Sequence, residues 1–98
     1  GENVSSIEVE DALLSHPAVR EAAVIGIPDE RWGQAITAVV QMADASVDDA
    51  NLIQSVKDQL AGYKAPKHIV RVPHLKRQAN GKSDYRWATR TAEESLGA

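Results

Sequence analysis

The stretch Ala79-Asn80-Gly81-Lys82 holds the residues best suited to chemistry in this 98-residue chain. Glycine adopts backbone conformations that are closed to other residues, and asparagine tolerates left-handed ones, so Asn80 and Gly81 predict a turn that presents the next side chain outward. A lysine there is a compact, mobile charge with three donors, which suits bridging the oxygens of an anionic substrate. A lysine after Asn-Gly is more often only a solvated turn residue, so this pattern alone leaves both interpretations open.

Other kinds of reactive site find little support in the sequence. The chain has no cysteine, which excludes disulfides and thiolate metal sites. Its histidines, which are His16, His68 and His74, are too scattered to predict a metal centre. No nucleophile elbow, EF-hand spacing or phosphate-binding glycine loop is present. We therefore expect no metal site within this chain.

Charge is divided unevenly along the chain. Residues 1–61 carry 3 basic and 11 acidic side chains, a net charge of −8, whereas residues 62–98 carry 8 basic and 3 acidic ones, a net charge of +5. Such asymmetry points to an anionic partner for the basic part, or to two ordinary solvated surfaces. A non-catalytic module that binds a polyanion is therefore one hypothesis, although no stacking aromatics or basic helix favour nucleic acid.

The composition indicates one globular domain. Hydrophobic residues make up 43% of the chain and charged residues 26%, which is typical of soluble proteins. No apolar run approaches the ~20 residues that a membrane helix needs, and we expect a cytoplasmic location. The chain begins with Gly1 and its single methionine is Met42, so we expect a fragment or a processed chain.

The first element is predicted to be a helix that starts near Ser5. Ser5 and Glu8 have the spacing of a capping box, in which each side chain bonds a backbone N–H of the first turn. The apolar positions Ile7, Leu13 and Leu14 predict its buried face. The helix should end at His16-Pro17, because the residue before a proline avoids the α region.

Three apolar runs predict strands. Val19–Ile27 and Ala35–Met42 are rich in β-branched residues, and a turn at Pro28-Asp29-Glu30 would let them pair antiparallel. Lys67–Val72 predicts a third, short strand that Pro73 closes.

Two further helices are expected. The first would be capped by Ser46 or Asp48, would stop at Gly62 and would bury Leu52, Ile53, Val56 and Leu60. The second would follow a loop over residues 74–81, would be capped by Ser83 or Asp84, and would carry Tyr85, Ala88 and Ala92 at helical spacing before a fraying tail over residues 93–98. The predicted fold class is α+β, with a small, largely antiparallel sheet of about three strands and flanking helices.

Taken together, six short segments carry a family resemblance. They are Gly1 to Glu10, His16-Pro17-Ala18-Val19, Ala23 to Asp29, Trp32-Gly33, Gly62-Tyr63-Lys64-Ala65-Pro66-Lys67 and Asn80-Gly81-Lys82. In this order and spacing they resemble the C-terminal domain of the adenylate-forming, or AMP-binding, superfamily. That superfamily includes acyl-CoA synthetases, nonribosomal peptide adenylation domains and luciferases. Trp32-Gly33-Gln34 and Asp84-Tyr85-Arg86-Trp87 most resemble bacterial acyl-CoA synthetases of the fatty-acid–CoA ligase type.

The resemblance implies a ligase that works in two steps. A carboxylic acid attacks ATP to give an acyl-adenylate and pyrophosphate, and the thiol of CoA then displaces AMP. Residues 1–98 would be the single mobile C-terminal domain, or lid, which is inactive in isolation. A large N-terminal domain, absent from this sequence, would bind most of the ATP, the Mg²⁺ and the acyl group. The expected partners are that domain and these small molecules, with no nucleic acid.

The resemblance also assigns residues to two faces. Lys82 matches the catalytic lysine of the adenylation step, with Asn80 and Gly81 as loop support. Five residues match the face that contacts CoA: Gly1, Trp32, Tyr63, Lys64 and Lys67. For Trp32 and Tyr63 the alternative is aromatic packing, and for Lys64 it is a structural ion pair.

The sequence departs from the family pattern in two places, and the acyl acceptor stays open. Many members carry Pro-Arg-Thr where this chain has Lys76-Arg77-Gln78, and some carry a basic residue in place of Ala65. The alternative to CoA as acceptor is a carrier protein, as in peptide synthetases. Acetylation of Lys82, which would remove its charge, is a further hypothesis for switching the enzyme off.

Overall fold

The computed structural model describes residues 6–31 and 33–97, which form three α-helices, three strands and one 3₁₀ turn. In chain order they are α1 (Ser6–Leu14), β1 (Val19–Asp29), β2 (Gly33–Met42), α2 (Asp49–Gln59), η1 (Gly62–Lys64), β3 (His68–Arg71) and α3 (Tyr85–Ser95). None of these helices has the length and apolarity needed to span a bilayer. The α+β class and the three strands are confirmed.

The sheet has the order β1-β2-β3 and is mixed. The long pair β1–β2 is antiparallel, as predicted, with Val24 opposite Ala38. The short strand β3 runs parallel to β2, with Val70 opposite Val39. The direction of β3 follows from its connection, because residues 43–67, including α2, carry the chain back to the starting end of β2. The β1–β2 turn was predicted too early: Pro28 and Asp29 still belong to β1, an edge strand where a missing N–H is tolerated.

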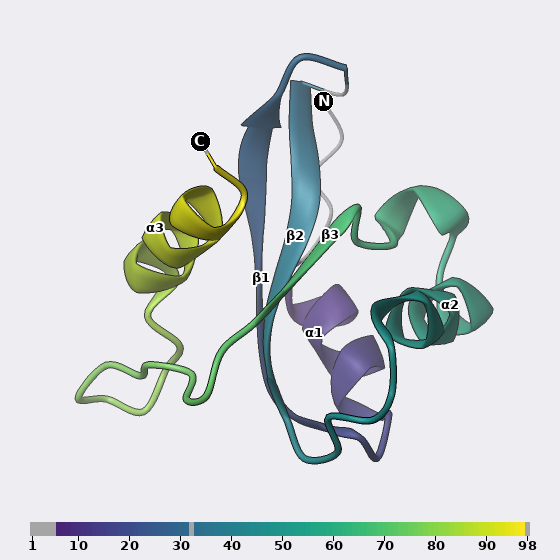
Figure 1. The fold of residues 1–98 in the computed structure, drawn as a ribbon, viewed down its shortest axis with the longest axis horizontal. Coiled ribbons are helices and arrows are strands. Elements are labelled where there is room, and N and C mark those ends of the chain that lie inside the picture. Colours follow the sequence, from purple (N-terminus) through teal and green to yellow (C-terminus); the bar gives the residue numbers. More distant parts are fainter. Residues whose placement is uncertain (1–5, 32, 98) are drawn as a thin grey trace.

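The helices cover both faces of the sheet (Figure 1). Alternate residues of the strands point to opposite faces, so the sheet divides the core in two. On one face α1 and α2 pack against the strands, and the largest fully buried side chains there include Leu13, Leu52 and Val56. On the other face α3 packs through Ala88 and Ala92, beside Leu75 from the loop after β3.

The buried face of α1 differs in part from the predicted one. Leu13 is buried as expected, but Ile7 is 64% exposed and Leu14 is 41% exposed. Val9 and Ala12 complete the buried face instead. At 3.6 residues per turn, Ile7 and Leu14 lie roughly 150° around the helix from Val9, on the side away from the sheet. Ser5 lies outside the described residues, so its predicted capping is not seen.

The caps of the other helices settle two of the alternatives. Asp48, not Ser46, caps α2, since its carboxylate accepts from the Asn51 N–H at 2.9 Å. Asp84 caps α3 by accepting from the Trp87 N–H at 3.0 Å. Gly62 was wrongly predicted to end α2: the helix ends at Gln59, and Gly62 opens η1. The expected tail also begins later, because α3 continues to Ser95.

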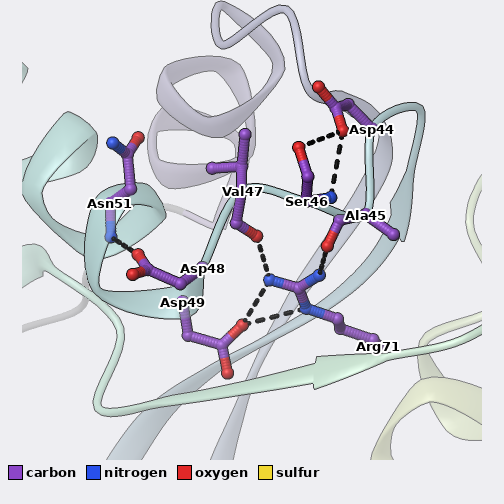
Figure 2. Close-up of polar contacts among 8 residues, drawn as sticks. All are labelled: Asp44, Ala45, Ser46, Val47, Asp48, Asp49, Asn51 and Arg71. Carbon is purple, nitrogen blue, oxygen red and sulfur yellow. Dashed lines mark hydrogen bonds and ion pairs between the residues drawn. The ribbon is translucent and has the colours of Figure 1, made fainter.

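Arg71 at the end of β3 fastens the loop that leads into α2 (Figure 2). Its guanidinium donates to the Asp49 carboxylate at 3.0 Å, to the Ala45 carbonyl at 3.1 Å and to the Val47 carbonyl. The planar fork of arginine allows one side chain to serve three acceptors. These contacts attach β3 to residues 45–49, which lie in the connection between β2 and β3.

Candidate functional site

Lys82 follows a tight hairpin turn. The Gly81 N–H donates to the Gln78 carbonyl at 2.9 Å, and the Gln78 N–H donates to the Lys82 carbonyl at 2.7 Å. Gly81 has φ +88°, a conformation that favours glycine. The Asn80 side chain accepts from the Lys82 N–H at 3.0 Å, which is the local bond expected of asparagine in a turn. The predicted turn at Asn80-Gly81 is confirmed.

The stem of this hairpin is held at several points. Arg77 and Ser83 form an isolated antiparallel bridge, and the Asp84 N–H donates to the Lys76 carbonyl at 3.1 Å. The Arg77 guanidinium donates to the Gly81 carbonyl at 2.8 Å and also forms an ion pair with Glu21 of β1. The hairpin is therefore an ordered projection and not a loose loop.

The side chain of Lys82 is exposed at the end of this hairpin. Within residues 6–31 and 33–97 its ammonium has no ion-pair partner, whereas the neighbouring Lys76 lies 3.9 Å from the Asp84 carboxylate. The ammonium is thus available to an anion brought to it from outside the domain. This geometry allows charge stabilisation of an oxyanion or a phosphoryl group.

The residues predicted to contact CoA are only partly described. Gly1 and Trp32 lie outside the described residues. Tyr63 and Lys64 are in η1, and Lys67 follows it as an exposed residue whose backbone N–H donates to the Ile36 carbonyl at 2.7 Å. The structure therefore brings Tyr63, Lys64 and Lys67 together around one turn.

Lys64 is engaged with an acid and an aromatic ring. Its ammonium lies 2.6 Å from a carboxylate oxygen of Glu8 in α1 and 5.9 Å from the centre of the Tyr63 ring. The hydrogen bond to Glu8 raises the pKa of Lys64, although partial burial opposes that effect. Tyr63 is 62% exposed, so it is not a core aromatic. The structural ion pair is thus the alternative that the geometry supports for Lys64.

The two candidate faces lie on opposite sides of the domain (Figure 1). Strand β3 separates them, because η1 precedes it and the hairpin over residues 76–84 follows it. The hairpin and η1 therefore do not form one common site on this domain.

Ion pairs account for part of the charge asymmetry of the sequence. Three of them join a base of residues 62–98 to an acid of residues 1–61: Lys64 with Glu8, Arg71 with Asp49 and Arg77 with Glu21. The basic part of the chain is thus neutralised internally at these positions, which weakens the case for a surface that binds a polyanion. In the described part of the chain, no group of three or more acidic or histidine side chains could hold a metal ion.

Comparison with known proteins identifies the family of this chain. A family model described as the AMP-binding enzyme C-terminal domain matches residues 8–82, which include Lys82 and every predicted CoA-face residue except Gly1. The chain belongs to this family. This match confirms the family resemblance found in the sequence of this AMP-binding C-terminal domain.

Relatives of this AMP-binding C-terminal domain are much longer proteins. The medium-chain acyl-CoA ligase Mig of Mycobacterium avium is 50% identical over 93 residues, which cover 94% of this chain and 17% of the ligase. A fatty acyl CoA synthetase of Mycobacterium tuberculosis has a similar structure, with a TM-score of 0.89 and 32% identity over 97% of this chain and 19% of the solved chain. The amide bond synthetase McbA of Marinactinospora thermotolerans has a TM-score of 0.83 and 36% identity over 90% of this chain and 18% of its own. The chain thus spans less than a fifth of each of them.

Three polar residues that support the AMP-binding C-terminal domain were not singled out from the sequence. Glu10 is a buried residue of α1 that contacts Tyr85 at the start of α3. Glu21 and Gln41 lie opposite each other on β1 and β2, and both contact the loop after β3. One signal was present: Glu10 interrupts the apolar face of a helix, which indicates a carboxylate with buried partners. Nothing in the local pattern marks Glu21 or Gln41, since their partners are distant in sequence.

Proposed function

We propose that residues 1–98 are the C-terminal lid domain of an acyl-CoA synthetase, an acid–thiol ligase. The observation that carries this proposal is the ordered hairpin that presents the exposed Lys82, in a family whose members include a medium-chain acyl-CoA ligase 50% identical to this chain. A carboxylate oxygen of the acid attacks the α-phosphorus of ATP and pyrophosphate leaves. The thiol of CoA, losing its proton, then attacks the acyl carbon and AMP leaves.

Lys82 serves the first of these steps. A carboxylate and a phosphate repel each other, and negative charge moves onto the phosphoryl oxygens in the transition state. A positioned ammonium in a water-poor site offsets both effects, and losing such a contact costs about 2.7–4 kcal/mol in comparable oxyanion sites. Because Lys82 is exposed on this domain, the water-poor site forms only when the lid closes on the N-terminal domain, so the isolated lid is inactive.

The opposite face serves the second step. Tyr63, Lys64 and Lys67 surround η1, and together with Gly1 and Trp32 they are proposed to contact CoA. The ion pair with Glu8 implies that Lys64 meets a CoA phosphate only by sharing its charge or by leaving Glu8. A lid that presents Lys82 first and η1 afterwards must therefore rotate between the two steps.

Magnesium ion belongs with the ATP in this proposal, and the lid does not hold it. The described residues contain no group of three or more metal-ligating side chains. The N-terminal domain would supply those ligands.

The decisive experiment replaces Lys82 by alanine in the full-length enzyme. Pyrophosphate release from ATP and the acid should fall by roughly 100–1,000-fold, the equivalent of one lost oxyanion contact. Thioester formation from supplied acyl-adenylate and CoA should persist, because it uses the other face. Lys76→Ala, which removes a charge from the same hairpin, is the matched control. Equal loss of both half-reactions in Lys82→Ala would contradict the role assigned to Lys82.

A different acyl acceptor is the second candidate function. The similarity to an amide bond synthetase indicates that lids of this kind also serve enzymes whose acceptor is not CoA. A carrier protein is the alternative acceptor that the family resemblance offers. Full-length enzyme loaded with acyl-adenylate should release AMP when CoA is added. Release with a phosphopantetheinylated carrier protein, but not with CoA, would favour the alternative.

A further inference from the structure

The hairpin that carries Lys82 is not held by apolar packing. Residues 76–82 are all exposed, and Leu75 is the nearest preceding side chain that is buried. An exposed hairpin of this kind takes its direction from polar contacts with the body of the domain. The contacts of Arg77 are therefore the first place to look for what directs Lys82.

Arg77 and Asn80 fix the peptide group that joins Gly81 to Lys82. Arg77 donates to the Gly81 carbonyl at 2.8 Å, and the Asn80 carboxamide accepts from the Lys82 N–H at 3.0 Å. The carbonyl and the N–H are the two polar ends of one planar peptide unit. Holding both ends fixes the plane from which the Lys82 side chain departs.

Glu21 holds Arg77 in turn. Its carboxylate forms an ion pair with the same guanidinium, and its side chain is only 33% exposed. Glu21 lies where the register of β1 shifts beside Val19, and such irregularities re-aim side chains. A continuous path of polar contacts therefore runs from β1 through Arg77 to the backbone at Lys82.

The base of the same loop is attached next to Glu21. Gln41 is the cross-strand partner of Glu21, so the two side chains lie on the same face of the sheet. The Gln41 carboxamide oxygen accepts from the Leu75 N–H at 2.9 Å. Neighbouring side chains of β1 and β2 thus hold the loop at its base and near its tip.

We propose that Glu21 and Arg77 are positioning residues for Lys82, which join strand β1 to the Gly81 carbonyl and so aim the lysine at the anion it meets. This inference rests on the proposed function. Neither residue touches the substrates; both act through the direction of the hairpin. A displacement of about 1 Å at a reacting group can reduce a rate by about 100-fold, so small losses of alignment are measurable.

The test uses the full-length enzyme and measures its two half-reactions separately. Arg77→Ala should lower kcat for pyrophosphate release by about 10–100-fold, because Lys82 keeps its charge but loses its alignment. Arg77→Lys should also be impaired, since an ammonium cannot reproduce the guanidinium fork that serves Gly81 and Glu21 together. Thioester formation from supplied acyl-adenylate should stay within about twofold of the parent enzyme.

A double-mutant cycle tests whether Glu21 and Arg77 act as one unit. Glu21→Ala should impair pyrophosphate release, and the double variant should be no worse than Arg77→Ala alone, because residues that share one interaction are not additive. Lys76→Ala is the control for a general loss of positive charge and should leave pyrophosphate release within about twofold of the parent.

Besides an Arg77→Ala variant that behaves like the parent, three results would overturn the proposal. They are fully additive effects of Glu21→Ala and Arg77→Ala, an equal fall of both half-reactions, and an equal defect in Lys76→Ala. Lys82→Ala is measured in parallel, so that the two proposals fail separately. If Lys82→Ala abolishes pyrophosphate release while Arg77→Ala does not change it, the positioning role is wrong and the proposed function stands. If Lys82→Ala has no effect, the proposed function itself is wrong.

Discussion

Replacing Glu10 by alanine should be among the most destabilising single changes in this domain. Glu10 is 8% exposed, and its carboxylate accepts from the Val24 N–H at 2.8 Å and from the Tyr85 hydroxyl at 2.9 and 3.1 Å. The Val24 N–H lies on the outer edge of β1, where none of the strands formed by residues 6–31 and 33–97 accepts from it. One side chain thus joins α1, β1 and the first residue of α3.

The magnitude follows from the partners that the substitution leaves behind. A buried polar group without a hydrogen bond costs about 1–3 kcal/mol, so losing the acceptor of the Val24 N–H should cost about 2 kcal/mol, and losing that of the partly exposed Tyr85 hydroxyl should add about 1 kcal/mol, about 3 kcal/mol together. A domain of this size has roughly 5–15 kcal/mol of stability in total. At 4–8 °C per kcal/mol, the melting temperature should fall by roughly 12–24 °C.

Equilibrium urea denaturation of the 98-residue chain measures this cost. Asp11→Ala is the matched control, because Asp11 is the next residue of α1 and is exposed. Tyr85→Phe and the double variant complete a cycle, and the loss in the double variant should be smaller than the sum of the two single losses. A change below about 0.5 kcal/mol for Glu10→Ala, the range of ordinary surface positions, would refute the reasoning.

Two further predictions follow from other polar contacts. Burial, then the hydrogen bond to Glu10 and the charge of Glu10, raise the pKa of Tyr85 from 10.0 to about 12, against the opposing charge of Arg77. Between pH 10 and 12 the folded chain should therefore keep this proton while the unfolded chain loses it, so the free energy of unfolding should fall as the pH rises through that window. Denaturation at a series of pH values should show this fall, and the fall should be smaller in Tyr85→Phe. Arg71→Met removes the donor of three hydrogen bonds to residues 45–49 and should cost about 1 kcal/mol of stability, because these acceptors regain water. The amides of that loop should exchange faster in Arg71→Met than in the exposed control Arg90→Met. Equal exchange in both variants would contradict the role given to Arg71.

The sequence was sufficient to predict the elements of the fold because its local signals are strong. α1 ends at Leu14, shortly before His16-Pro17, the β-branched runs form β1 and β2, and Asp48 and Asp84 are caps with side chains of the preferred type. These signals act over a few residues, so one sequence reveals them.

The direction of β3 and the end of α2 could not be predicted in the same way. Whether β3 runs parallel to β2 depends on where residues 43–67 deliver it, and a four-residue strand carries no mark of direction. Gly62 looked like a helix stop, but Leu60 already leaves the helix with extended backbone and packs against the core. Both outcomes are set by tertiary packing.

The candidate site was predictable only in its outline. Asn80-Gly81 predicts the turn, but the residues that hold its loop are distant in sequence: Glu21 lies 60 residues before Gly81, and Gln41 lies 39 residues before Asn80. Likewise, the positive charge of Lys64 is visible in the sequence while its pairing with Glu8 is not. Long-range polar contacts of this kind leave no periodicity, and they determine how each face is held.

Attraction between the acidic and basic parts of the chain also acts before the domain folds, because Coulombic attraction requires no particular geometry. Residues 62–98 contain β3 and α3, which must meet β1 and β2 from a distance in sequence, and such long-range contacts carry an entropic cost that a local hairpin avoids. Net charges of −8 and +5 draw the two parts together in the unfolded chain. Salt shortens the range of that attraction to about 8 Å at physiological ionic strength, so we expect refolding followed by stopped flow to slow as salt is added. The bases that fasten the hairpin and β3 in the finished domain would then also help to recruit these segments during folding.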